Sequence, residues 1–133
     1  TKNGDVIDKY IKLIKNDFDL KEEKIEFYVQ KLNEKLEILV KFTEWIKDKI
    51  KNSPEDASAA CNDYLKVLGL VATAHSWIKV LEVSFKEYEN NKEFYEEKIQ
   101  TAKFFFNRVL PKAESHFLAA STGSKYIMDY KFN

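Results

Sequence analysis

Few side chains in this sequence could bind a metal ion. His75 and His116 are its two histidines, and Cys61 is its one cysteine. A di-iron helical bundle takes ligands from Glu-x-x-His pairs, because that spacing puts both side chains on one helix face. Glu114 and His116 are two positions apart and therefore point in different directions. We predict no metal site, since these ligands are too few for a zinc centre.

Carboxylates are numerous, but their spacing is typical of solvated helix faces. Most lie among lysines at intervals of three or four residues. Examples are Glu22 with Glu26, Glu34 with Glu37, and Glu93 with Glu97. A catalytic acid pair is an open alternative, although nothing in the sequence selects one pair over another. We therefore predict no catalytic residue in this chain.

Cys61 and His75 have local surroundings that favour structural roles. Cys61 lies in the segment EDASAACNDY among small residues and without a neighbouring histidine, so we interpret it as an ordinary helix residue. No carboxylate lies three or four positions from His75, and we expect a rim or hydrogen-bonded histidine there. The sequence contains no G-x-G-x-x-G motif and no P-loop, so we predict no cofactor-binding residue.

Charge and cysteine content limit the classes of partner. The 22 basic residues balance 22 acidic ones, and Arg108 is the only arginine, which argues against a nucleic-acid partner. The longest apolar run, residues 67–78, is too short to span a bilayer and includes His75, so no transmembrane segment is expected. One cysteine cannot form an intramolecular disulfide, and no signal peptide is evident. We therefore expect a cytoplasmic protein.

Helical periodicity dominates the rest of the chain. Apolar residues recur every three or four positions over residues 5–15, 20–51, 54–90 and from Lys92 onward. Three glycines and two prolines are few for 133 residues, so long stretches are uninterrupted. The sequence therefore predicts a short helix followed by longer ones.

Several residues predict where these helices begin and end. Ser53 followed by Pro54 suits an N-cap and the first residue of a helix. Asp19 is a second predicted N-cap. Pro111 lies inside the last periodic segment, where it should kink the helix or end one and start another. Gly123 should stop that helix.

Long helices joined by short turns favour a bundle. We predict an all-α fold, an antiparallel four-helix-type bundle with a Pro-kinked last helix and a short N-terminal helical arm. The length suits a single domain over residues 1–133. Because the chain starts with Thr1, we expect a domain excised from the C-terminus of a longer protein.

One mostly apolar stretch, DYLKVLGLVATAHSWIKV at residues 63–80, contains a strip of small side chains. Such a strip lets another backbone approach, either inside the bundle or at a docking surface. Three consecutive phenylalanines cannot share one helix face, so at least one should lie at a rim or interface. A broad core face and a ligand-stacking platform are both open for them. The candidate docking residues are Gly69, Ala72, Thr73, Ser76, Phe104, Phe105 and Phe106.

Two stretches carry a family signal, YLKVLGLVATAHSWIKV at residues 64–80 and KIQTAKFFFNRVLPKAESH at residues 98–116. Both resemble the extra C-terminal helical domain of one branch of the acyl-CoA dehydrogenases, the acetyl-CoA dehydrogenase C-terminal-like domain. The first half of the chain matches only as an amphipathic helical hairpin. The matching positions are Tyr64, Leu65, Gly69, Trp77, Lys98, Thr101, Ala102, Phe105, Leu110, Pro111 and Ala113.

The resemblance implies a parent flavoenzyme. Such enzymes use FAD to oxidise the α–β bond of an acyl-CoA thioester, as in fatty acid β-oxidation. Their flavin pocket and catalytic carboxylate belong to preceding domains, so this chain is implied to be non-catalytic and to meet acyl-CoA only through the parent enzyme. The implied partners are the catalytic domains of the same chain or of a sister subunit.

Two other classes of function are open. The chain could be a free-standing helical module that binds other proteins. It could also be a small binder of acyl chains or lipids with an aromatic cavity.

Overall fold

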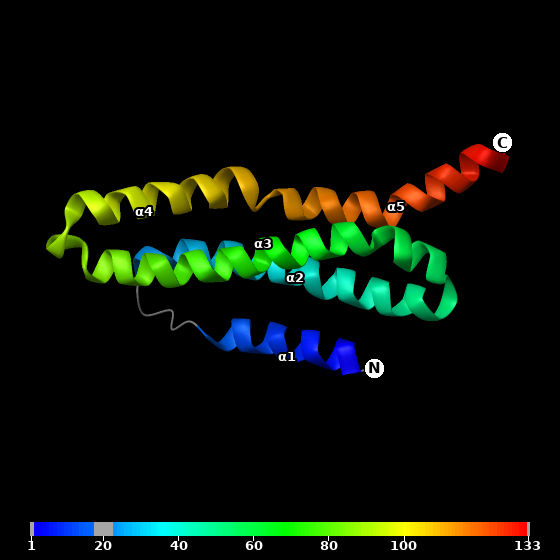
Figure 1. The fold of residues 1–133 in the computed structure, drawn as a ribbon, viewed down its shortest axis with the longest axis horizontal. Coiled ribbons are helices and arrows are strands. Elements are labelled where there is room, and N and C mark those ends of the chain that lie inside the picture. The colour runs from blue at the N-terminus through cyan, green and yellow to red at the C-terminus, as the bar shows by residue number, and fades with distance from the viewer. Residues whose placement is uncertain (1, 18–22, 133) are drawn as a thin grey trace.

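Helices α2 (Glu23–Asn52) and α3 (Pro54–Lys86) form a long antiparallel hairpin, and the later helices pack along it (Figure 1). The computed structural model describes the backbone of residues 2–17 and 23–132 and the side chains of residues 6–17 and 23–122. Within these ranges the regular structure is entirely helical, which confirms the predicted all-α fold. The remaining elements are α1 (Lys2–Asn16), η1 (Tyr88–Asn90), α4 (Lys92–Phe104), η2 (Phe105–Val109) and α5 (Lys112–Phe132).

The turn between α2 and α3 lies where the sequence predicts it. Ser53 occupies the N-cap position and Pro54 is the first residue of α3. The Ser53 hydroxyl does not cap a backbone N–H but donates to Asp56 Oδ2 at 2.9 Å. The missing N–H of Pro54 costs nothing here, because the first N–H groups of a helix have no partner inside it.

α3 ends earlier than its predicted boundary at residue 90. The 3₁₀ turn η1 follows it, and Asn91 caps the next helix by accepting a hydrogen bond from the Phe94 N–H at 3.2 Å. An asparagine cap competes with continued helix because its side chain replaces a missing backbone acceptor. α3 and α4 are therefore separate antiparallel helices.

Pro111 separates α4 from α5, as predicted. Proline has no N–H, and its ring displaces the carbonyl four residues earlier. The backbone forms the π-turn η2, in which the Leu110 N–H donates to the Phe105 carbonyl at 2.9 Å. The predicted stop at Gly123 is wrong, because the backbone of α5 continues to Phe132. Glycine permits the left-handed conformation that ends a helix but does not impose it.

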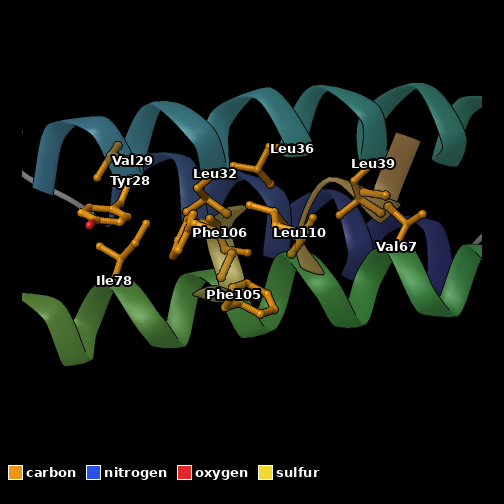
Figure 2. Packing of buried hydrophobic residues seen from close by; sticks show 14 of the residues in the cluster. Tyr28, Val29, Leu32, Leu36, Leu39, Val67, Ile78, Phe105, Phe106 and Leu110 are labelled. Carbon is orange, nitrogen blue, oxygen red and sulfur yellow. The ribbon is translucent and has the colours of Figure 1, made fainter. Parts of the chain in front are cut away.

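The core runs along the seam between α2 and α3 and is closed by the π-turn (Figure 2). Apolar side chains of α2 recur at helical spacing and are almost fully buried, as are those of α3 that face them. Phe105 and Phe106 of η2 and the next residue after it, Leu110, fill the third side. The α2 and α3 side chains labelled in Figure 2 are Tyr28, Val29, Leu32, Leu36, Leu39, Val67 and Ile78.

The predicted N-terminal arm is α1, which runs antiparallel to α2 (Figure 1). Ile11 and Ile14 are buried against the bundle. Lys47 Nζ donates to Asp8 Oδ2 at 2.9 Å and ties the arm to α2. The predicted N-cap at Asp19 and the predicted start of the second helix at residue 20 lie outside the described residues.

Candidate docking surface on α3 and α4

The predicted strip of small residues lies on the outside of α3. Gly69, Thr73 and Ser76 are exposed, and Ala72 is half-buried. A methyl group placed at Gly69 would meet no neighbouring side chain or helix of the described chain within 4 Å. The structure therefore rules out a close helix contact inside the described bundle at Gly69, which was one of the two predicted roles.

The hydroxyl groups of the strip are satisfied by its own helix. Thr73 Oγ1 donates to the Gly69 carbonyl at 2.8 Å, and Ser76 Oγ donates to the Ala72 carbonyl at 3.2 Å. A partner covering these hydroxyls would therefore leave few polar groups without a hydrogen bond. Because both hydroxyl hydrogens are already bonded, the strip can be covered by an apolar partner surface at little cost in lost hydrogen bonds.

Two large exposed apolar side chains extend the strip in both directions. Leu65 is 56% exposed and Val83 is 53% exposed. Both are separated from members of the strip by steps of four or seven residues, which keeps them on one side of the helix. We call the set Leu65, Gly69, Ala72, Thr73, Ser76 and Val83 the outer face of α3.

α3 has more apolar surface than the bundle buries. It is long and apolar enough to cross a membrane by length and composition, and only 33% of its most apolar window is buried. The uninterrupted apolar run at residues 67–78 is shorter than the 18-residue window that meets this criterion. A core helix of a bundle meets the same criterion, and the buried side of α3 packs on α2, α4 and α5. The excess apolar surface lies on the other side.

The three phenylalanines divide between core and surface. Phe105 and Phe106 are 7% and 4% exposed, whereas Phe104 is 63% exposed. The Phe106 ring meets the Tyr28 ring edge to face, with 5.1 Å between centroids. One phenylalanine does lie outside the core, as predicted. Phe105 and Phe106 are removed from the candidate docking surface because the π-turn directs both inward.

An open groove of about 680 Å³ lies beside this surface, between α3 and α4. Trp77 of α3 lines it together with Glu93, Glu96 and Glu97 of α4. These carboxylates oppose the charge of a dinucleotide pyrophosphate, so the groove does not fit FAD. The sequence pattern of Glu93 and Glu97 indicates only a solvated helix face. Their position opposite Trp77 depends on how α3 and α4 pack, which local spacing does not predict.

His75 is hydrogen-bonded at the surface, as expected, but to a distant partner. Its Nε2 lies 2.6 Å from Asp17 Oδ2, and Lys79 Nζ lies 2.8 Å from the same oxygen. The hydrogen bonds from Lys79 and then His75 lower the pKa of Asp17. The contact fastens the end of α1 to α3. Its partner is 58 residues away, so no local sequence signal could have identified it.

The potential metal ligands do not gather in the described part of the chain. No group of three or more His, Cys, Asp or Glu side chains suited to a metal occurs among the described residues. Cys61 is an exposed free thiol on α3. His116 pairs with Asp63 across the α3–α5 contact.

Comparison with known proteins identifies the family. Residues 5–131 match the family described as acetyl-CoA dehydrogenase C-terminal like, which is nearly the whole chain. No curated protein and no solved structure matches it. The match extends the resemblance of the second half to the first, where α1 and α2 lie. The chain therefore belongs to the acetyl-CoA dehydrogenase C-terminal-like family.

Proposed function

We propose that this chain is a docking domain of a flavin-dependent acyl-CoA dehydrogenase. It binds the catalytic body of its own chain or of a sister subunit and stabilises that assembly. One observation supports this role. Small and apolar side chains are exposed along the outer face of α3, and no described helix covers Gly69. Family membership supplies the class of enzyme.

The outer face of α3 suits a protein partner for three reasons. Small side chains let a partner helix come close, which increases the number of van der Waals contacts. The strip hydroxyls already donate within their own helix, so covering them is inexpensive. Leu65 and Val83 add one exposed large apolar side chain at each end, which a protein partner would cover.

Catalysis is assigned to the rest of the parent enzyme. The family relationship supports FAD-dependent oxidation of an acyl-CoA thioester, of the fatty acid β-oxidation type, by domains outside this chain. The groove beside Trp77 has the wrong charge for the flavin dinucleotide. The exposed free thiol of Cys61 suits a reducing, cytoplasmic location, which we include in the proposal.

Substitution of Gly69 tests the docking role in the full enzyme. Gly69→Leu adds a large side chain to the outer face at a position where a Cβ would meet no neighbouring helix or side chain within 4 Å. We expect a lower melting temperature of the enzyme or a changed oligomeric mass, measured by calorimetry and light scattering. The isolated domain should keep its melting temperature or gain a few degrees, because leucine favours helix over glycine by roughly 0.8 kcal/mol.

A matched control places the same side chain elsewhere on α3. Ala59 is exposed and lies outside the outer face, so Ala59→Leu should leave the enzyme's mass and stability unchanged. Deletion of the whole domain is the broader test. If the truncated enzyme keeps its oligomeric mass, melting temperature and turnover, the docking role is wrong.

A further inference from the structure

The groove between α3 and α4 exposes a fixed aromatic ring. Trp77 is partly buried and packs against the hydrophobic core, while part of its side chain lines the groove. Residues of α4 from Glu93 to Thr101 form the opposite side. At 1.5 Å per residue this side is about 12 Å long, so the groove is larger than a single small ion needs.

Negative charge dominates the lining. Glu93, Glu96 and Glu97 face one cation, Lys98. Lys98 Nζ lies 5.1 Å from the ring centre of Phe94, a residue of the same helix α4. None of the three glutamates forms an ion pair with a lysine or arginine among the described residues. Glu93 and Glu97 therefore carry most of the charge available to a partner, since the nearby Lys103 partly offsets that of Glu96.

Glu96 is held as a fixed anion. Gln100 Nε2 donates to Glu96 Oε1 at 2.9 Å, and Tyr88 Oη donates to Glu96 Oε2 at 3.0 Å. These hydrogen bonds, that of Gln100 first, lower the pKa of Glu96. Hydrogen bonds to a carboxylate favour its charged form and restrict its rotamers. The negative charge is thus positioned before any partner arrives.

An aromatic face surrounded by carboxylates matches one side chain best. The guanidinium of arginine is planar, stacks on indole and pairs with carboxylates through its fork of N–H donors. It is also less strongly hydrated than the lysine ammonium, so its partial desolvation against the Trp77 ring costs less. Phosphate groups and acidic peptides would be repelled by the same charges.

We propose that this groove binds an arginine-bearing segment of a protein partner. One guanidinium stacks on Trp77 and pairs with Glu97, while a second basic side chain reaches Glu93. The partner is the one assigned under the proposed docking role, and the inference rests on that role for the partner's identity. The length of the groove along α4 favours a peptide segment over a free cation.

Fluorescence of Trp77 tests the proposal on the 133-residue chain. The chain has two tryptophans, so Trp45→Phe leaves Trp77 as the only one. The probe is a short synthetic peptide in which arginine alternates with alanine and leucine, and the reference peptide has glutamine in place of arginine. We expect the arginine peptide alone to change the Trp77 emission, with an affinity that falls as salt is added.

Charge-removal variants identify the groove. Glu93→Gln with Glu97→Gln should weaken binding of the peptide about tenfold or more, because it removes both carboxylates that the proposal pairs with basic side chains. Glu26→Gln with Glu55→Gln removes two exposed carboxylates outside the groove and should have no effect. Circular dichroism of each variant checks that the bundle is intact.

Two outcomes would overturn the proposal. Equal affinity of the arginine peptide for both double variants would show attraction to overall charge. Equal or tighter binding of spermine would show a free-cation site instead of a peptide site. Failure in either way leaves the docking role untouched, because that role is tested separately by deletion and by Gly69→Leu in the full enzyme.

Discussion

His116 Nδ1 lies 2.8 Å from Asp63 Oδ1 and joins α5 to α3. The two residues are 53 positions apart, and the π-turn at Phe105–Val109 lies between them. Next to the pair, the Phe117 ring packs on Phe42 with 5.1 Å between centroids. A slip of α5 along α3 would separate the imidazole from the carboxylate, so the pair fixes the register of the last helix.

Removing either member of this pair should destabilise the bundle. His116→Ala and Asp63→Ala should each lower the free energy of unfolding by about 1 kcal/mol, the usual net value of such a hydrogen bond. A double-mutant cycle from urea unfolding measures their coupling. Asn62→Ala, at an exposed neighbouring position, is the control and should be nearly neutral. Strict additivity of the two single variants would contradict a direct interaction.

Lys35 and Glu114 should respond asymmetrically to mutation. Lys35 is 7% exposed, and its Nζ donates to Glu114 Oε1 at 2.8 Å. Glu114→Gln leaves a buried ammonium without its counter-charge and should cost about 1 to 3 kcal/mol. Lys35→Met replaces the buried cation by an apolar side chain of similar length and should be neutral or stabilising. Thermal and urea unfolding of both variants measure the two effects. Equal destabilisation by both substitutions would contradict this account.

Acid should weaken the bundle, most of all through two carboxylates whose hydrogen bonds join segments far apart in the chain. Hydrogen bonds from Lys79 and His75 lower the pKa of Asp17 below its ordinary 3.8, and a hydrogen bond from Lys35 lowers that of Glu114 below 4.5. A carboxylate whose folded pKa is depressed stabilises the fold above its unfolded pKa, and that stability is lost as the pH falls through the folded pKa.

The free energy of unfolding should therefore decline as the pH is lowered from about 5 to below 3. Urea unfolding across this range measures the decline. Asp17→Asn should reduce its slope, and hydrogen exchange in α1 should rise in that variant already at neutral pH because the arm loses a contact to α3. A slope identical to that of the unmodified chain would count against Asp17 as a contributor.

Gly69→Ala should stabilise the isolated domain. Gly69 lies inside a helix, and no described glycine has a positive φ, so alanine is compatible with the backbone. The added methyl group meets no neighbouring helix or side chain within 4 Å. Alanine should therefore gain up to about 1 kcal/mol over glycine in helix propensity. Differential scanning calorimetry measures the change, and a loss of stability would mean that Gly69 packs closely within the bundle.

The helices and their breaks could be predicted from sequence because their causes are local. Apolar residues at helical spacing define the buried faces, Ser53 and Pro54 start α3, and Pro111 separates α4 from α5. The predicted helix end at Gly123 is wrong because a glycine permits a helix to end there but does not force it to. The family signal was likewise readable from residues adjacent in the chain.

Tertiary structure alone decided which faces remain exposed. The small strip around Gly69 fits both a buried helix contact and an open surface, and only the packing of α2, α4 and α5 on the other side of α3 places it outside. The π-turn decides that Phe105 and Phe106 are buried while Phe104 is not. The His75 contact with Asp17 likewise joins residues far apart in the chain. Local periodicity defines a helix and its faces, whereas burial depends on which distant segments pack against it.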